Sequence, residues 1–317
     1  MPRPSDTDPA EITVIMVSYK TRDLTLKALE TLHNTTKTAF KTILFDNASG
    51  DGTAEAVTAQ FPDVDVIASP ENLGFAKANN LAAGRADTEW LLLLNPDTEC
   101  HEGAVDNLLA FSKSHPKAGI TGGRTVFPDG SLNIASCWMR MTPWSTFCNA
   151  TGLRALFPKS EFFNSEAMGA WPRDSVREVD IVVGCFLMLR RTLWQRLGGF
   201  DPRYFMYGEE ADLCLRAKAL GYRPMITPDA QIMHLVGASS GSARVKHAVM
   251  VAKARMTLIE DHWPRPAIAF GRAMMTLWAG LRAYGLGALT RTTGQKKDAA
   301  KTWRGIWAER ANWRQGY

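Results

Sequence analysis

Two aspartates follow apolar segments of this chain, at positions where a carboxylate could do chemistry. The segment LLLLNPDT, residues 91–98, places Asp97 shortly after four leucines, and KTILFDNASGDGT, residues 41–53, places Asp46 at the end of another apolar run. Each has an ordinary explanation, because Asp is common in turns. However, Asp97 is also a suitable ligand for Mg²⁺ or Mn²⁺ bridging a diphosphate. Asp46 could accept the imide N–H of uracil or thymine.

A second acidic group and one histidine add to these candidates. The segment GEEADL contains Glu209, Glu210 and Asp212. Acidic residues favour a helix N-terminus, so capping is the ordinary explanation. Because close like charges raise a carboxyl pKa, one of the three could instead be a general base that deprotonates an acceptor hydroxyl. His234 at the end of an apolar segment could complete a metal shell as a neutral imidazole, although a lone histidine is more often structural.

The elements that must position these residues alternate between apolar, β-branched segments and segments with helical spacing. This alternation predicts right-handed βαβ units and a doubly wound α/β fold with a mostly parallel sheet flanked by helices. Ligands bind such sheets beyond the carboxyl ends of the strands. Polar residues follow three of the four predicted strands there: Ser18 and Tyr19, Asp46 and Asn47, and Asn95 and Asp97. The sequence therefore predicts one site at this edge of the sheet.

The rest of the chain is less regular. Residues 127–179 contain prolines and no steady period, which predicts mostly loops and irregular strands, and Gly184 in the next apolar segment indicates a close approach to the backbone. From residue 244 to 317 the pattern is helical, with 14 Lys/Arg against 4 Asp/Glu and five of the ten tryptophans. This basic, Trp-rich tail either docks on an anionic membrane surface or packs with a solvated basic face.

Composition excludes several classes of protein. The hydrophobic fraction of 45% and charged fraction of 22% are those of a globular chain. Five cysteines without a CxxC pair argue against a disulfide framework or zinc knuckle and suit a reducing cytoplasm. No apolar run reaches the roughly 18 residues of a membrane span. Residues 1–11 are polar and proline-rich, which predicts a disordered lead rather than a signal peptide.

Six segments together resemble a known family. VSYKTRDLTLKAL, DNASGDGT, ENLGFAKANN, LLLLNPDT, GGFDPRYFMYGEEADLCLR and HLVGAS occur in the order and spacing of family 2 glycosyltransferases with the GT-A fold, most similar to bacterial rhamnosyltransferase-type enzymes of cell-surface polysaccharide assembly. The resemblance implies a GT-A catalytic domain over residues 12–243. Its nucleotide-sugar-binding half would span 12–125 and its acceptor-binding half 126–243, followed by the helical tail over 244–317.

The resemblance also implies roles for the residues that bind the donor. NPD stands where the family has DxD, so Asp97 would hold the Mg²⁺ or Mn²⁺, and Asn95 in place of the first aspartate could make the site less dependent on metal. His234 matches a histidine that reaches the metal in some relatives. Lys77 either contacts phosphate or is solvated. The nucleotide-sugar-binding residues implied are Ser18, Tyr19, Asp46, Asn47, Asn72, Gly74, Lys77 and Asn95, with Asp46 recognising the base and Tyr19 stacking on it.

Glu210 matches the family's catalytic base, although many relatives have aspartate there, so Glu209 and Asp212 remain alternatives. The implied function is inverting, metal-assisted transfer of a sugar, with rhamnose from dTDP-rhamnose as the first expectation. The acceptor would be a glycan or polyprenyl-diphosphate-linked hydroxyl. The implied location is the cytoplasm, with peripheral docking on the inner face of the plasma membrane as one option.

Two other functions remain open. A non-catalytic sugar-nucleotide-binding partner subunit would keep Asp46 and Asp97 but would need no base. A nucleotidyltransferase would typically have a glycine-rich phosphate loop after the first strand, and VSYKTRD contains no glycine. Nucleic acid is not an expected partner, because no recognised nucleic-acid motif accompanies the basic tail.

Overall fold

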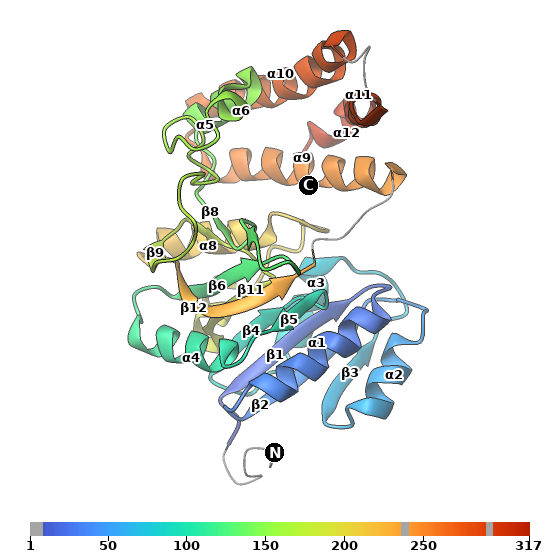
Figure 1. The fold of residues 1–317 in the computed structure, drawn as a ribbon, viewed down its shortest axis with the longest axis vertical. Helices are drawn as coiled ribbons and strands as arrows, with labels where there is room; N and C mark the ends of the chain where they lie inside the picture. The colour runs from blue at the N-terminus through green and yellow to red at the C-terminus, as the bar shows by residue number, and fades with distance from the viewer. Residues whose placement is uncertain (1–8, 236–240, 290–293) are drawn as a thin grey trace. The chain divides into compact units, whose positions relative to one another are not determined.

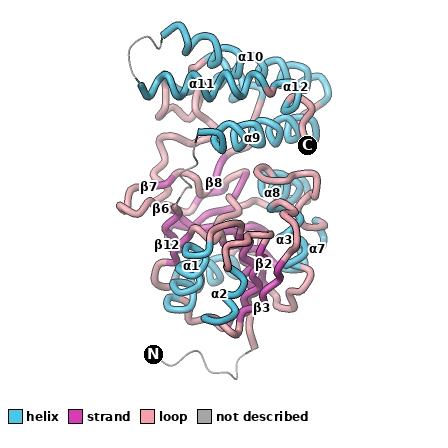
Figure 2. The backbone as a smooth tube through the Cα atoms, turned by 90° about the vertical axis from the view of Figure 1, so that its right-hand side faces the viewer, coloured by secondary structure: helices cyan, strands magenta, loops and turns pink. Residues whose placement is uncertain are grey.

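The chain is organised in two compact units in a computed structural model that describes residues 9–235, 241–289 and 294–317 (Figures 1 and 2). The sheet unit comprises Met1–Trp138, Pro172–Pro202 and Glu210–Val236. The helical unit comprises Met139–Trp171, Arg203–Glu209 and Gly237–Tyr317. Residues 1–8 of the predicted lead and the end of the HLVGAS segment lie outside the described residues.

The sheet unit is built on a sheet of ten strands in the order β3-β2-β1-β4-β11-β6-β12-β5, with β7 paired to β6 and β9 paired to β12. Strands β1 to β4 are mutually parallel where they pair, β11 runs antiparallel to both β4 and β6, and β12 runs parallel to β6. The strands are β1 (Ile12–Ser18), β2 (Phe40–Asp46), β3 (Val64–Ala68), β4 (Trp90–Leu94), β5 (Thr98–Cys100), β6 (Ile120–Val126), β7 (Leu132–Asn133), β9 (Arg177–Glu178), β11 (Phe186–Arg190) and β12 (Met225–His234). Strands β8 (Cys137–Trp138) and β10 (Ile181–Val182) form a separate pair.

Helices alternate with the first strands, as the sequence predicts, and the mixed, mostly parallel α/β architecture is confirmed. The helices of this unit are α1 (Arg22–Thr35), α2 (Thr53–Gln60), α3 (Phe75–Ala83), α4 (Ala104–Ser114), α7 (Arg191–Leu197) and α8 (Glu209–Ala219), whose first residue falls in the helical unit. Figure 1 shows α1 lying over β1, and Leu29 and Leu32 of α1 share one core cluster with Leu92 and Leu94 of β4. All five residues of β4 are buried. Burial of the strand explains its leucines and leaves the polar residues of NPDT to follow at its end.

The helical unit contains α5 (Pro143–Thr151), α6 (Leu153–Leu156), α9 (Gly241–His262), α10 (Arg265–Leu289), α11 (Gly294–Ala308) and α12 (Arg310–Trp313). The helical character predicted for the C-terminal tail is confirmed. The prediction of loops and irregular strands over 127–179 is wrong for α5 and α6. Helix α5 begins with a capping box between Thr142 and Ser145 and has Pro143 in its first turn, a start signal that the scattered prolines obscured.

The tryptophans of the tail contribute to the core of the helical unit. Trp313 is fully buried beside Met256, Ile259 and Met275, and Trp263, Trp278, Trp303 and Trp307 pack partly buried against the same cluster. Two polar pairs also fix the segment Arg203–Glu209 within this unit. Arg203 donates to Asp261 at 2.6 Å, and the Tyr317 hydroxyl donates to the Met206 carbonyl at 2.7 Å.

Two expectations from composition can be compared with the described residues. All five cysteines are free thiols and buried. Within the described ranges, no helix combines the length and the apolar character that crossing a membrane requires.

Candidate functional site

The carboxyl ends of β1 and β2 bring the first predicted site residues together. Ser18 is paired with Asp46 in the register of these two parallel strands, and the Ser18 hydroxyl donates to Asp46 Oδ1 at 3.3 Å. Both side chains are buried. The carboxylate of Asp46 is therefore held at the edge of the sheet by its neighbour strand, as the sequence predicts for a group in a strand-end site.

Asn47 continues this edge into the segment before α3. Its Nδ2 donates to Asn72 Oδ1 at 3.0 Å and to the Gly74 carbonyl at 3.2 Å, and its Oδ1 accepts the backbone N–H of Leu73 at 2.8 Å. The Gly74 backbone has a positive φ of 80°, which a residue without Cβ adopts readily. Asn47, Asn72 and Gly74 thus form one network, and in this network the amides shape the loop.

Tyr19 and Lys77 are the exposed members of the predicted donor site. The Tyr19 side chain is 45% exposed, with the Lys20 ammonium 5.4 Å from its ring centroid. Its ring is therefore accessible for stacking. Lys77 is exposed on the first turn of α3 and makes no hydrogen bond or ion pair with the described residues, so contact with phosphate and simple solvation both remain compatible with its position.

Asp97 and His234 meet because β5 pairs antiparallel with β12. Thr98 is opposite His234 in this register, and the Leu235 N–H donates to the Asp97 carbonyl at 2.9 Å. The Asp97 Oδ1 and His234 Nε2 atoms lie 3.4 Å apart. The Asp97 side chain is 22% exposed, and the His234 side chain is mostly buried. The carboxylate therefore reaches solvent from a backbone that two strands hold in place.

The environment of His234 is electrostatically distinctive. Burial by itself lowers the pKa of the imidazole, but the neighbouring Cys185 and Asp97 side chains outweigh burial and raise that pKa to about 10. Asn95 also contacts Cys185, because its backbone N–H donates to the Cys185 carbonyl at 3.1 Å. The Asn95 Oδ1 atom is buried and has no hydrogen-bond partner in the described part of the chain. An acceptor without a donor suits an environment completed by a bound group.

The side chains of Asp97 and His234 fit a divalent cation that takes most of its ligands from water and substrate phosphates. No group of three or more His, Cys, Asp and Glu side chains suited to a metal occurs among the described residues. However, Mg²⁺ commonly binds proteins through one or two carboxylates plus waters and substrate phosphates. Asp97 can provide such a partial shell, and His234 can join it once its imidazole has lost the proton that the raised pKa favours.

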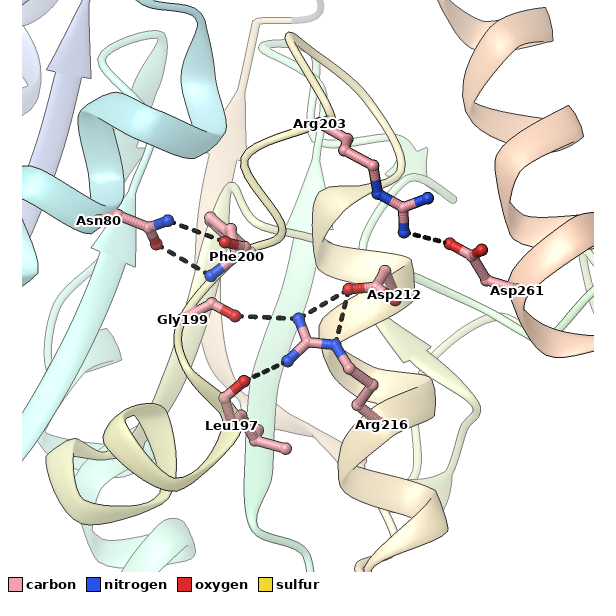
Figure 3. Close-up of polar contacts among 8 residues, drawn as sticks. All are labelled: Asn80, Leu197, Gly199, Phe200, Arg203, Asp212, Arg216 and Asp261. Carbon is pink, nitrogen blue, oxygen red and sulfur yellow. Dashed lines mark hydrogen bonds and ion pairs between the residues drawn. The ribbon is translucent and has the colours of Figure 1, made fainter. Parts of the chain in front are cut away.

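The three acidic residues at the start of α8 differ in their surroundings. The Asp212 carboxylate is buried. It accepts hydrogen bonds from Nε and Nη2 of Arg216, each at 2.7 Å (Figure 3). Glu209 is buried, whereas Glu210 is only partly so. A Cβ built on Gly184 would lie 3.8 Å from the Glu210 Cβ and 3.6 Å from the Phe75 ring. These are ordinary van der Waals distances, so the close approach predicted at Gly184 is not found.

Two residues that the sequence did not single out fix the segment leading toward α8. Asn80 of α3 donates to the Phe200 carbonyl at 2.8 Å and accepts the Phe200 N–H at 2.9 Å. Arg216 donates to the carbonyls of Leu197 and Gly199 at 2.5 and 2.9 Å (Figure 3). The sequence signals were an asparagine inside a helix and an arginine four residues after an aspartate, which ordinarily indicate surface positions.

A family model described as glycosyl transferase family 2 matches residues 13–180. The chain is 28% identical over 262 residues to the N-acetylglucosaminyl-diphospho-decaprenol L-rhamnosyltransferase of Mycobacterium tuberculosis (strain H37Rv), covering 78% of this chain and 83% of that protein. It is 29% identical over 233 residues to rhamnosyltransferase WbbL of Escherichia coli K12, covering 70% and 82%.

Among solved structures, the mannosyltransferase PcManGT from Pyrobaculum calidifontis, in complex with GDP-Man and Mn²⁺, matches with a TM-score of 0.58 and 19% identity. The match covers 99% of this chain and 87% of that one. At this identity the likeness concerns the fold.

Proposed function

This chain belongs to glycosyl transferase family 2 and is rhamnosyltransferase-like, and on that premise we propose that it transfers rhamnose from dTDP-rhamnose to a hydroxyl of a lipid-linked glycan. The relatives named rhamnosyltransferases support the sugar. The name of the mycobacterial relative, which contains a diphospho-decaprenol carrier, supports a polyprenyl-diphosphate-linked acceptor.

The observation that carries the proposal is the common edge formed by β1, β2 and β4. Because β1 pairs parallel with both β2 and β4, their carboxyl ends lie on the same side of the sheet. Asp46 is the last residue of β2, and Asp97 lies shortly after the end of β4. In the proposed complex, the base of the donor lies against Tyr19 and Asp46, and its diphosphate extends toward Asp97.

Asp97 and His234 are the residues proposed to hold Mg²⁺ or Mn²⁺. The cation would act as a Lewis acid that offsets negative charge on the departing diphosphate. To serve as a ligand, His234 must give up the proton that its raised pKa favours. Asn95 brings no charge, so the site has one carboxylate fewer than a site with two aspartates.

Glu210 is the proposed general base. Asp212 is engaged with Arg216 in a buried, charge-assisted pair, and its loss would leave the arginine without its counter-ion. Glu210 is partly exposed, whereas Glu209 and Asp212 are buried. It would take the proton of the acceptor hydroxyl as that oxygen attacks the anomeric carbon opposite the leaving group. A single displacement of this kind inverts the configuration.

Peripheral association with a membrane is proposed for one face of α10. Phe270, Leu277, Leu281 and Tyr284 are exposed, and their spacing places them on one side of the helix. The opposite side buries Met275, Ala279 and Ala283. An apolar face on a basic region suits the interface of an anionic bilayer, where a polyprenyl-linked acceptor would be located.

A panel of sugar nucleotides, each with and without Mn²⁺, tests the proposed function. Binding is measured by calorimetry and transfer by release of the nucleotide diphosphate in the presence of a polyprenyl-diphosphate-linked acceptor. We expect dTDP-rhamnose to give the tightest binding and the fastest release, and Asp46→Asn to weaken binding of every uracil or thymine nucleotide. A flat response across the panel would instead indicate a non-catalytic partner subunit.

A further inference from the structure

A second cavity lies within the sheet unit, away from the proposed donor edge. It has a volume of about 400 Å³ and is lined by residues that include Trp90, His115, Arg190, Thr192, Arg196 and Tyr222. This volume is within the roughly 300–1,000 Å³ typical of pockets that hold small organic ligands. The lining residues lie on or beside β4, α4, β6, β11, α7 and the end of α8, all of which belong to one unit. The cavity therefore does not depend on the arrangement of the two units.

The strand registers place this cavity at the opposite edge of the sheet. Trp90 is the first residue of β4, whereas Asn95 and Asp97 follow the last. Arg190, at the end of antiparallel β11, is paired with Trp90. A five-residue strand rises about 3.3 Å per residue, so the two edges are separated by roughly 15 Å. The donor edge and the cavity are thus distinct.

The Trp90 indole supplies an unsatisfied donor. Its side chain is only 3% exposed, and its Nε1–H has no hydrogen-bond acceptor among the described residues. Buried tryptophan N–H groups usually have a partner, because leaving a buried donor unpaired costs about 1–3 kcal/mol. The Arg190 guanidinium lies 4.5 Å from the centroid of the same ring. A ligand that offers an acceptor beside Trp90 would remove that cost.

The charge of the cavity indicates which ligand. Its lining contains two arginines and a histidine, together with the hydroxyls of Thr192 and Tyr222, and includes no carboxylate. Arg190 is already paired with Glu89, but Arg196 makes no ion pair or hydrogen bond with any described residue. The His115 imidazole uses Nδ1 toward the Phe111 carbonyl at 3.0 Å, which leaves Nε2 for a ligand. Such a set of donors matches a multivalent oxyanion.

The shape adds a requirement beyond charge. Gly119 has a φ of 69°, and a Cβ there would lie 2.5 Å from the Tyr222 ring, so glycine allows this aromatic ring to pack against the backbone. Tyr222 provides a flat apolar surface, on which a sugar or a heterocycle can stack. The volume exceeds what a phosphate group occupies, so the cavity has room for an organic part beside the phosphate.

We propose that this cavity is a second binding site, which takes a small phosphorylated organic molecule such as a sugar phosphate. Its phosphate would be held by Arg196, His115 and Arg190. Its organic part would lie against Tyr222 and offer an acceptor to the Trp90 indole N–H. Occupancy would add contacts between β4 and α7 without touching the donor edge. The inference does not depend on the proposed donor or acceptor.

Calorimetric titration of the full chain with glucose 6-phosphate tests the site. We expect one binding event, weakened at least tenfold by Arg196→Ala. Arg85→Ala, which removes an exposed arginine paired with Asp65 elsewhere on the sheet unit, should leave the affinity unchanged. Glucose should not bind, and inorganic phosphate should bind more weakly than glucose 6-phosphate. Asp46→Asn should preserve this binding even where it weakens nucleotide binding.

Three results would overturn the inference. The first is no binding at millimolar glucose 6-phosphate, and the second is equal affinity for inorganic phosphate, which would remove any role for the organic part. The third is loss of binding in Asp46→Asn, which would place the probe at the donor edge. Trp90→Phe gives a second measurement that does not alter charge. If it remains folded by circular dichroism, its affinity should fall, and an unchanged affinity would remove the indole from the site.

Discussion

The side-chain amide of Asn80 makes two hydrogen bonds with the backbone of Phe200, a residue 120 positions later in the chain. It donates to the Phe200 carbonyl and accepts from the Phe200 N–H. The amide thereby acts as a substitute for a neighbouring strand. It joins α3, beside the proposed donor site, to the segment that Arg216 fixes from α8. Asn80 and Arg216 together thus connect α3 with α8, the helix that carries the proposed base.

Replacing this amide should lower stability measurably. Asn80→Ala removes two hydrogen bonds and leaves the polar groups of Phe200 unpaired, so the free energy of unfolding in urea should fall by about 2–4 kcal/mol. Asn107→Ala is the matched control, because that side chain makes one exposed hydrogen bond to the Asp229 carbonyl. Its expected loss is about 1 kcal/mol or less. Similar losses for both variants would show that the pairing with Phe200 is not important for stability.

The stabilisation of the protein by a divalent cation should depend on Asp97. We expect Mn²⁺ to raise the melting temperature of the protein in the presence of dTDP, and Asp97→Ala to abolish that increase while a metal-independent part remains. His234→Ala should reduce the increase by a smaller amount, because imidazole is the weaker ligand for such a cation. Glu99→Ala is the control, since it removes a nearby carboxylate outside the proposed site. An undiminished Mn²⁺ effect in Asp97→Ala would move the cation elsewhere.

Substitutions at Glu210 and Asp212 should affect different properties: catalysis at Glu210 and stability at Asp212. Glu210→Gln should retain donor affinity and lose transfer by a factor of about 10²–10⁴, the usual contribution of a general base. Asp212→Asn breaks the charged pair with Arg216 and should lower the free energy of unfolding by about 2 kcal/mol or more. Single-turnover transfer and urea unfolding measure the two effects. Normal turnover in Glu210→Gln would transfer the base role to Glu209 or Asp212.

The apolar face of α10 should determine membrane binding. The double variant Leu277→Glu, Leu281→Glu should reduce co-sedimentation with phosphatidylglycerol vesicles by at least about tenfold, because burying each leucine contributes about 1.5–3 kcal/mol. The control is Leu24→Glu, Leu81→Glu, which changes two exposed leucines of the sheet unit. Equal pelleting of all three proteins would refute membrane contact through α10.

The C-terminal tyrosine should make stability depend on alkaline pH. Burial raises the pKa of Tyr317 to about 12, against the effect of its hydrogen bond to Met206. The folded state therefore retains a phenol proton that the unfolded chain has lost, so this contribution is complete below pH 10 and declines as pH rises toward 12. Tyr317→Phe should be less stable than the wild type at pH 8, with a difference that narrows at pH 11. A constant difference would show that the phenol does not titrate with unfolding.

Much of the fold from β1 to β4 could be predicted from the sequence, because its signals are local. Apolar segments at 12–18 and 91–94 belong to strands buried on both faces, and helical spacing between them requires parallel connections. Parallel connections place successive strand ends at one edge, so the sequence alone predicts that Asp46 and Asp97 lie at that edge.

Other features depend on contacts between distant segments. The distance of 3.4 Å between Asp97 and His234 results from pairing of β5 with β12, and neither strand's sequence specifies its partner. The contacts of Arg216 with the Leu197 and Gly199 carbonyls and the inward packing of the tail tryptophans likewise appear only in the folded chain. Local periodicity identifies which residues share a face of a helix or strand. Tertiary packing decides whether that face meets a core, another polar group or solvent, because the free energy of burial depends on the neighbours that supply it.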